Sequence, residues 1–259
     1  MRELKLFVQE LPFEIEEALN RLRVNVKFTD SDIHSIMVTS SIPNEGKSFT
    51  SFQLWRMLAD AGLKTCLVDL DIRNSVFTSR FGARCEDGKE LIGVDHYLSG
   101  LAELDDVIYS TNYKNGDIVP VSHVLENPSI LLDGKRCKEL IKTLSERYRY
   151  VLVDTAPLVN VSDASLIASY CDSALLVIRA NYTAKKAVKH SLNQLNLAGC
   201  KILGSVLLRT ESGARSYGKY YGKKYGYGKY GYGKYGDGYG YGKESEGRRK
   251  KLKGAHAKR

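Results

Sequence analysis

Residues 41–48, SIPNEGKS, decide the fold of this chain. They form a turn-rich loop between an apolar, β-branched run at 34–40 and an amphipathic segment at 49–62. The run predicts a buried strand, and the apolar spacing of the segment predicts a helix that stops at Gly62. A Gly-Lys-Ser loop between a strand and a helix is typical of a P-loop, with Ser41 at the position of the first glycine in the usual pattern.

The chemistry of this loop suits a polyphosphate. Backbone N–H groups at the opening of a helix can surround phosphate oxygens. The Lys47 ammonium would reach the β and γ phosphates, and the Ser48 hydroxyl would bind Mg²⁺. The predicted nucleotide-binding residues are Asn44, Glu45, Gly46, Lys47, Ser48 and Phe49.

Carboxylates follow two further apolar runs. LVDLDIR (67–73) places Asp69 and Asp71 at the end of one predicted strand, and YVLVDTAP (150–157) places Asp154 at the end of another, in the manner of a Walker B motif. A carboxylate buried there is costly without a cation, which a bound metal would provide. In a less specific interpretation, Asp69 caps the loop and Asp71 pairs with Arg73 at the surface. The predicted metal ligands are Ser48, Asp69 and Asp154, and the predicted catalytic residues are Lys47, Asp69, Asp71 and Asp154.

Strand and helix patterns alternate along the rest of the chain, and several strands are apolar almost throughout. This pattern predicts an α/β fold of the P-loop NTPase type, a mostly parallel sheet flanked by helices, with ligands at the carboxyl ends of the strands. Residues 74–92 look irregular. The predicted strands are 34–40, 64–71, 116–122, 173–180 and 201–208, and 149–157 is predicted as a strand followed by a loop. The predicted helices are 13–28, 49–62, 94–99, 103–109, 129–147, 162–171 and 183–197.

The carboxyl-terminal part of the chain differs from the rest in composition. Residues 217–243 contain 10 Tyr, 10 Gly, 6 Lys and 1 Asp, and no other residue type. Without aliphatic side chains, such a stretch cannot bury enough surface to offset its chain entropy. We therefore predict a P-loop domain over 1–212 and a disordered tail over 213–259, which carries a tyrosine cluster at 217–241 and a basic end.

The formal net charge of +9 is unevenly placed. The first 212 residues carry a net charge of −2, and residues 213–259 carry +11. The basic character belongs to the tail, so no nucleic acid is expected as a partner. The histidines at positions 34, 96, 123 and 190 are scattered, which favours structural or surface roles.

The cysteines and the N-terminus bear on location. Five cysteines without CxxC spacing indicate reduced thiols of the cytoplasm rather than disulfides or a zinc site. The acidic N-terminal segment predicts that there is no signal peptide, and no apolar run approaches the length of a transmembrane helix. Any role at a membrane is therefore expected to come through a partner or the tail.

Taken together, these motifs resemble the cytoplasmic kinase domain of the bacterial tyrosine kinases (BY-kinases) of the capsular and exopolysaccharide biosynthesis group. SIPNEGKS resembles that family's Walker A, LVDLDIR its Walker A′ and YVLVDTAP its Walker B. The stretch 127–157 resembles the family's NPSELL-to-Walker B segment, and the resemblance as a whole covers roughly residues 12–245. The tyrosine cluster is the most specific feature, because the related partitioning ATPases lack it.

The resemblance implies an ATP- and Mg²⁺-dependent tyrosine kinase that autophosphorylates its tyrosine cluster in trans, within a homo-oligomer that in this family is a ring. It implies regulation of capsular or exopolysaccharide synthesis or export, further tyrosine-phosphorylated protein partners, and a cytoplasmic location at the inner face of the membrane through a transmembrane activator. Asp69 or Asp71 would take the proton from the attacking tyrosine, with Asp69 preferred. The implied phosphorylation sites are Tyr217, Tyr220, Tyr221, Tyr225, Tyr227, Tyr230, Tyr232, Tyr235, Tyr239 and Tyr241.

The same resemblance makes the helix at 13–28 the oligomer interface. The family's ExxRxxR pattern falls on Glu17 and Arg23, which match, while Asn20 replaces the first arginine. Arg21 could substitute for that arginine from the adjacent helix face, about 100° away. Near the end of the last strand, Leu208-Arg209 stands where family members often have an asparagine that contacts the base.

Two other functions stay open from the residues. A MinD/ParA-type regulatory ATPase would share the loop and the acids but use water as the attacking group; such proteins usually have a lysine early in the P-loop, where this chain has Ser41-Ile42-Pro43. A tyrosine-rich binding module would use the tail to stack on nucleic acid or sugars. Lys47, Asp69 and Asp154 favour the enzyme over the module.

Overall fold

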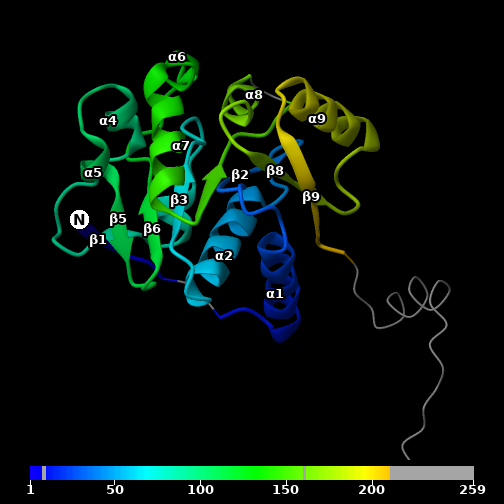
Figure 1. The fold of residues 1–259 in the computed structure, drawn as a ribbon, viewed down its shortest axis with the longest axis horizontal. Helices are drawn as coiled ribbons and strands as arrows, with labels where there is room; N and C mark the ends of the chain where they lie inside the picture. Colours follow the sequence, from blue (N-terminus) through cyan, green and yellow to red (C-terminus); the bar gives the residue numbers. More distant parts are fainter. Residues whose placement is uncertain (8–9, 160–161, 211–259) are drawn as a thin grey trace, which may run out of the picture. The chain divides into compact units, whose positions relative to one another are not determined.

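A nine-stranded sheet organises the part of the chain that the computed structural model describes, residues 1–7, 10–159 and 162–210 (Figure 1). Six neighbouring strands of this sheet run parallel to one another, as the alternating pattern predicts. In spatial order they are β6 (Gly116–Val119), β3 (Thr65–Asp69), β7 (Tyr150–Asp154), β2 (Ser35–Ser40), β8 (Ser173–Arg179) and β9 (Lys201–Leu208). The predicted α/β class with a mostly parallel sheet is therefore confirmed.

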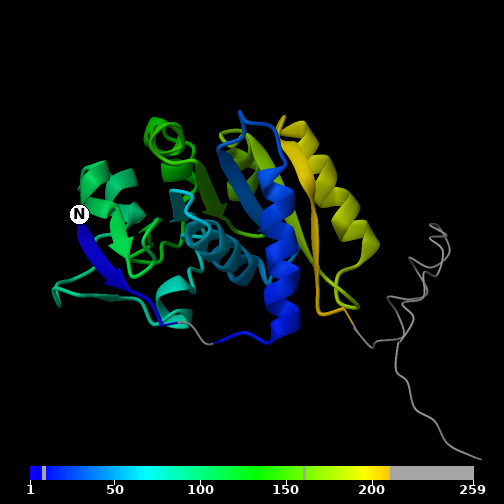
Figure 2. The ribbon, with the colours of Figure 1, turned by 60° about the horizontal axis from the view of Figure 1, so that its bottom comes forward.

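Helices cover both faces of the sheet (Figures 1 and 2). One face carries α1 (Phe13–Lys27), α2 (Lys47–Asp60) and α3 (Phe77–Arg80). The other face carries α4 (Val94–Leu98), α5 (Leu104–Val107), α6 (Ser129–Leu132), α7 (Lys135–Arg147), α8 (Asp163–Ala168) and α9 (Lys185–Leu197).

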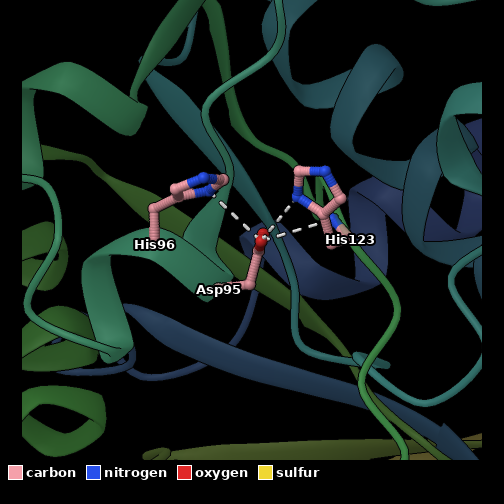
Figure 3. Close-up of side chains that lie close together, drawn as sticks. All are labelled: Asp95, His96 and His123. Atoms are coloured by element: carbon pink, nitrogen blue, oxygen red, sulfur yellow. Dashed lines mark hydrogen bonds and ion pairs between the residues drawn. The ribbon is translucent and has the colours of Figure 1, made fainter.

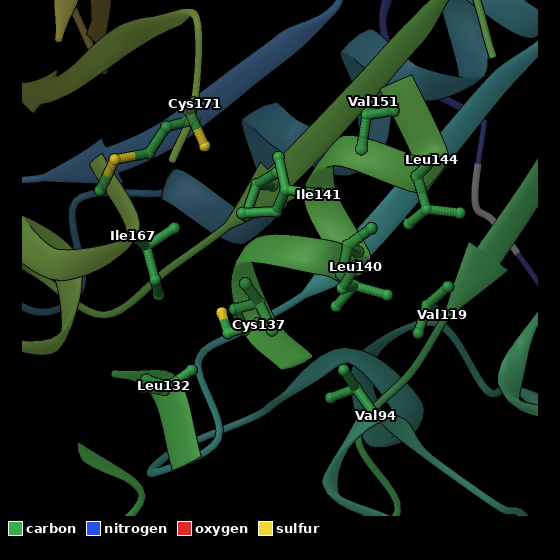
Figure 4. Close-up of a cluster of buried hydrophobic side chains, with 14 of the residues drawn as sticks. Val94, Val119, Leu132, Cys137, Leu140, Ile141, Leu144, Val151, Ile167 and Cys171 are labelled. Carbon is green, nitrogen blue, oxygen red and sulfur yellow. The ribbon is translucent and has the colours of Figure 1, made fainter. Parts of the chain in front are cut away.

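Side chains of the central strands alternate between the two faces. On β7, Leu152 packs in the cluster under α2, whereas Val151 and Val153 pack in the cluster under α7. Figure 4 shows part of that second cluster, in which Leu140 and Leu144 of α7 lie against the sheet. A strand that is buried on both faces has to be apolar almost throughout, which is why these strands are clear in the sequence.

The far edge of the sheet was not predicted. It contains β5 (Tyr109–Thr111), β1 (Arg2–Lys5) and β4 (Arg84–Cys85), of which β5 lies antiparallel to β6 and β1 lies parallel to β5. These strands are short and partly polar. Arg2 stabilises the edge, because its guanidinium pairs with Asp87 at 2.9 Å and donates to the Tyr109 hydroxyl at 3.1 Å.

Two predicted helices have different limits in the structure. The segment 103–109 is helical only as far as Val107, because Tyr109 joins the sheet. The segment 129–147 is two helices rather than one. The break lies at Asp133 and Gly134, where Gly134 has extended backbone angles and begins α7.

Among the described residues, no helix has both the length and the apolar character needed to cross a membrane. The predicted tail, with its tyrosine cluster and basic end, lies outside the described residues.

The packing of β6 on α2 predicts the cost of adding one methyl group. A Cβ atom on Gly116 would lie 2.5 Å from Cζ2 of Trp55, whose indole is fully buried. We expect Gly116→Ala to lower the free energy of unfolding by about 1–3 kcal/mol, measured by urea denaturation and far-UV circular dichroism. In a Trp55→Phe background the same substitution should cost less, because the smaller ring leaves room. An unchanged midpoint for Gly116→Ala would contradict this packing.

Candidate active site

The sheet brings two of the predicted acids together. β3 and β7 are adjacent and parallel, and their register pairs Asp69 with Asp154. Because side chains alternate along a strand, Asp69 lies on the same face as Leu67, and Asp154 lies on the same face as Leu152. Both of these leucines pack in the cluster under α2. The two carboxylates therefore face the beginning of α2, where Lys47 lies.

The loop before α2 has the backbone of a phosphate-binding turn. Gly46 has a φ of +99° and stands immediately before Lys47, the first residue of α2. A Cβ atom on Gly46 would lie 2.5 Å from Cδ1 of Leu208 at the end of β9. Asn44 has a φ of +65°. Glycine at position 46 is thus required both by its backbone angle and by the close approach of β9.

Glu45 stabilises this loop from inside the protein. Its side chain is 2% exposed and accepts hydrogen bonds from the backbone N–H of Ile42 at 2.7 Å and of Arg179 at 3.2 Å. It also accepts a hydrogen bond from the Thr183 hydroxyl. Glu45 was predicted to bind nucleotide. In this position its carboxylate serves the loop, and a phosphate would meet only its backbone N–H.

Lys47 lies among carboxylates. Its ammonium Nζ is 2.5 Å from Oδ2 of Asp71 and 3.2 Å from Oγ of Ser48. Burial alone would lower the pKa of Lys47, but the charges of Asp154 and Asp71 outweigh burial and raise it. Lys47 is therefore protonated and positively charged in this site.

Asp69 and Asp154 are buried behind Lys47, at 2% and 4% exposure. Burial, and then the neighbouring charge of Asp154, raise the pKa of Asp69 to about 7. Burial likewise raises the pKa of Asp154, although Lys47 acts in the opposite direction. Both shifts come first from burial, which disfavours the charged carboxylate. Three carboxylates, those of Asp69, Asp71 and Asp154, lie around the one ammonium of Lys47.

A divalent cation fits this arrangement. Within the described part of the chain, Oδ1 of Asp154 is buried without a hydrogen-bond partner. The hydroxyls of Ser48 and Ser51 lie beside the same carboxylate. Carboxylate and hydroxyl oxygens are the ligands that Mg²⁺ prefers, and an oxygen buried without a partner is costly unless a ligand occupies it.

Asp69 and Asp71 are almost equally buried, at 2% and 3% exposure, but their surroundings differ. The two oxygens of Asp69 accept hydrogen bonds from the Asp71 backbone N–H at 3.0 Å and from the Ser75 hydroxyl at 2.5 Å. Asp71 instead lines an open cleft of about 330 Å³, together with Lys47 and Ser48. Of the predicted nucleotide-binding residues, Asn44, Gly46, Lys47 and Ser48 line this cleft, as do Arg73, Asn74 and Arg80 from the other side.

The suggested surface pair of Asp71 with Arg73 is wrong. Asp71 pairs with Lys47, while Arg73 pairs with the buried Asp163 at 2.5 Å and donates to the Ser129 hydroxyl at 2.9 Å. The sequence contains no local signal of the Arg73–Asp163 pair, because the two residues are 90 positions apart. Phe49, also predicted at this site, lies under the guanidinium of Arg80, 5.7 Å from the ring centre.

The proposed interface helix, α1, packs on α2 through a Glu16–Arg56 ion pair of 2.7 Å. Asn20, which departs from the family pattern, accepts hydrogen bonds from the Arg23 guanidinium at 3.0 and 3.1 Å. Arg21 is exposed, and Glu17 is half-buried. The helix also exposes large apolar side chains, namely Phe13, Ile15 and Val24.

A P-loop between a parallel strand and a helix, with carboxylates at the ends of the neighbouring strands, defines a nucleotide-binding domain of the P-loop NTPase class. Residues 35–202 accordingly match the AAA domain family. The chain is 36% identical over 231 residues to the tyrosine-protein kinase CpsD of Streptococcus pneumoniae, which covers 86% of this chain and 100% of that protein. The chain therefore belongs to the family of bacterial tyrosine-protein kinases.

Solved structures agree with this assignment. The kinase domain of the Escherichia coli tyrosine kinase ETK superposes with a TM-score of 0.67 at 28% identity, covering 83% of this chain and 80% of that one. The septum site-determining protein MinD of Pyrococcus horikoshii, in complex with Mg-ADP, superposes with a TM-score of 0.58 at 26% identity, covering 69% and 72%.

The two constraints on Gly46 predict a selective loss of nucleotide binding. We expect Gly46→Ala to weaken binding of a fluorescent ATP analogue at least about tenfold, because the added methyl group must displace either the loop or Leu208. Gly62→Ala is the matched control: its φ is +82°, but a Cβ atom there would meet no other atom within 4 Å. The left-handed backbone strains alanine at both positions. If Gly46→Ala and Gly62→Ala bind the ATP analogue with equal affinity, contact with Leu208 has no role.

Proposed function

We propose that this tyrosine kinase transfers the γ-phosphoryl group of ATP to tyrosines of the cluster at 217–241 on another copy of itself. The observation that carries the proposal is the cleft lined by Lys47, Ser48 and Asp71, with the buried carboxylates of Asp69 and Asp154 beside it. Ten tyrosines in one stretch of the same chain provide the acceptors.

The residues of the cleft divide the work of phosphoryl transfer. Backbone N–H groups of the loop and the Lys47 ammonium would bind the phosphates and neutralise the charge that develops on them. Ser48, Asp69 and Asp154 would hold Mg²⁺, which supplies charge neutralisation at the β and γ oxygens. Such a site works by positioning and electrostatics, since the transfer needs little covalent chemistry from the protein.

Asp71 is the better candidate for the group that accepts the tyrosine proton. It lines the cleft, whereas both oxygens of Asp69 are occupied by Ser75 and by the loop backbone. When a triphosphate provides negative charge for Lys47, the Lys47–Asp71 pair can open and leave the Asp71 carboxylate available. This assignment replaces the preference for Asp69 that the motif alone favours.

Transfer between copies is proposed from the resemblance to the BY-kinases. Tyr217 lies nine residues beyond Leu208, the last residue of β9, and β9 ends beside the P-loop, where a Cβ atom on Gly46 would lie 2.5 Å from Cδ1 of Leu208. Nine residues span at most about 30 Å, so the chain's own cleft and a neighbouring cleft are both within reach, and a mixture of variants separates them. We propose α1 as the contact between copies, since Arg23 is oriented by Asn20 and the helix exposes apolar side chains. Glu17, Arg21 and Arg23 are its proposed polar contacts, and copies that associate head to tail can close into a ring.

Phosphorylation would change the charge of the tail. Residues 217–243 carry six lysines and one aspartate. Each phosphate adds about −1.5 to −2, so about three phosphates would cancel that positive charge. Accumulated phosphate would then weaken the docking of the tail at acidic surfaces of a neighbouring copy.

The cellular role is proposed from the resemblance to the capsular and exopolysaccharide group. In that role the kinase regulates polysaccharide synthesis or export from the cytoplasmic face of the membrane, where a transmembrane activator binds it, and acts on other proteins' tyrosines as well. The alternative, an ATPase of the MinD type, would transfer the phosphoryl group to water. Whether a labelled γ-phosphate ends on tyrosine or as free phosphate therefore separates the kinase from the ATPase.

Mixing two variants tests transfer between copies. One chain carries Lys47→Met with all tyrosines intact, and the other is active but has phenylalanine at the ten tyrosines of 217–241. We expect substantial label from γ-labelled ATP on the Lys47→Met chain only in the mixture. Lys47→Met alone should become labelled about 100- to 1,000-fold more slowly than the wild type, which is the cost of losing one electrostatic donor. If wild-type protein labels itself but the mixture does not, transfer occurs within one chain. Release of free phosphate without labelled tyrosine would favour the ATPase.

The three acids should differ in what their loss does. Asp71→Asn should reduce the transfer rate roughly 100- to 10,000-fold while Mg-ATP still binds, because it removes the proton acceptor. Asp154→Asn and Asp69→Asn should instead raise the Mg²⁺ concentration needed for half-maximal rate. The measurement is a Mg²⁺ titration of the labelling rate, with nucleotide binding followed in parallel. A larger loss at saturating Mg²⁺ for Asp69→Asn than for Asp71→Asn would return the base role to Asp69.

A further inference from the structure

Two histidines that look unrelated in the sequence lie beside one buried aspartate. Asp95 and His96 lie in the first turn of α4, and His123 follows β6. Figure 3 shows both imidazole rings directed at the Asp95 carboxylate. Nδ1 of His96 lies 3.2 Å from Oδ2 of Asp95, and Nδ1 of His123 lies 3.4 Å from the same oxygen. Histidines 96 and 123, which look scattered in the sequence, are therefore neighbours in the fold.

We propose that Asp95, His96 and His123 form a binding site for a divalent transition metal, with Zn²⁺ as its probe. Ligand atoms about 2.0–2.1 Å from a tetrahedral Zn²⁺ lie about 3.3–3.4 Å from one another. The two nitrogen–oxygen distances match that spacing, and the three ligand atoms lie within 4.8 Å of one another. A water molecule or the nearby Ser122 hydroxyl would complete four ligands.

The charge of Asp95 supports a cation at this place. Its side chain is 6% exposed, and among the described residues its ion-pair contacts are with these two histidines alone. A buried carboxylate is costly unless a cation is present. Imidazole nitrogens suit zinc and its neighbours in the transition series but not Mg²⁺, so this site is chemically distinct from the nucleotide site.

Ser122 holds the carboxylate in the orientation that a metal needs. Its backbone N–H donates to Oδ1 of Asp95 at 2.9 Å, and its hydroxyl lies 2.8 Å from both carboxylate oxygens. The backbone N–H of His123 donates to Oδ2 at 3.3 Å, and the same oxygen faces the two imidazoles. Partners of this kind, which fix a ligand from behind, are typical of metal sites. The backbone N–H of Gly93 is 3.4 Å from Nδ1 of His96 but 3.0 Å from Oγ of Ser122. The Ser122 contact can therefore satisfy Gly93 while the imidazole binds metal.

The site is also open to solvent. The His96 and His123 side chains are 28% and 58% exposed, so an ion can enter and the His123 ring can adjust. Because β6 runs parallel to β3, the loop with His123 lies at the same edge of the sheet as the kinase cleft.

Backbone contacts connect this loop to the cleft. The N–H of Leu125 donates to the carbonyl of Ile72 at 3.0 Å, and the Arg73 guanidinium donates to the carbonyl of Glu126 at 2.6 Å. Ile72 and Arg73 directly follow the proposed base, Asp71. Metal bound between α4 and this loop would stabilise the segment that presents Asp71 and Arg73.

Zn²⁺ binding to the full-length protein tests the proposal. Titration calorimetry in excess Mg²⁺, which occupies the nucleotide site, should give one Zn²⁺ per chain, and Co²⁺ should give the visible absorption of a tetrahedral nitrogen–oxygen site. Zn²⁺ should also raise the melting temperature. His96→Ala and His123→Ala should each lower the Zn²⁺ affinity at least about 10- to 100-fold, and Ser122→Ala should lower it less.

The matched controls are His190→Ala, on the exposed surface of α9, and His256→Ala in the tail. Both should bind Zn²⁺ like the wild type. The proposal is overturned if the wild type shows no stoichiometric site, or if the controls lose as much affinity as His96→Ala and His123→Ala. Circular dichroism establishes that each variant is folded, and Ser122→Ala keeps both imidazoles, so a lower affinity there cannot come from loss of a histidine ligand.

Discussion

The site depends on one electrostatic constraint, the excess of buried carboxylate over positive charge at the beginning of α2. Asp69, Asp71 and Asp154 lie around the ammonium of Lys47, and burial, followed by the charge of Asp154, raises the pKa of Asp69. Such a group of charges is costly in the apoprotein, and a divalent metal ion would supply the missing positive charge. In the proposed function, the affinity for Mg²⁺ would therefore depend on the arrangement of these four side chains.

The surrounding structure keeps that arrangement in place. The pairing of β3 with β7 sets Asp69 beside Asp154, and Glu45 ties the P-loop to the end of β8 through Arg179 and Thr183. Gly46 then allows β9 to approach the loop through Leu208. Most residues that make these contacts would not touch the nucleotide themselves. Each contact nevertheless determines the position of a group that would bind it.

Candidate functional residues lie at the carboxyl ends of the parallel strands on both faces of the sheet. Nucleotide chemistry lies on the α2 side, while Asp95, His96 and His123 lie on the side of α4 and α7. The segment from Asp71 to Arg73 contributes Asp71 to the cleft and contacts Leu125 and Glu126 in the loop that follows His123. Loops after parallel strands converge at this edge, which brings this segment close to both groups of residues.

The P-loop, the strand-end acids and the parallel sheet can be predicted from the sequence, because each rests on local spacing: a Gly-Lys-Ser turn before a helix, and apolar runs that end in aspartate. The tertiary structure was needed to show that Lys47 pairs with Asp71, that Arg73 pairs with Asp163, and that Glu45 turns inward. It was also needed to show the edge formed by β1, β4 and β5, and the meeting of His96 with His123. These features join residues far apart in the chain, and neither propensity nor periodicity carries information about a partner that only the folded sheet brings near.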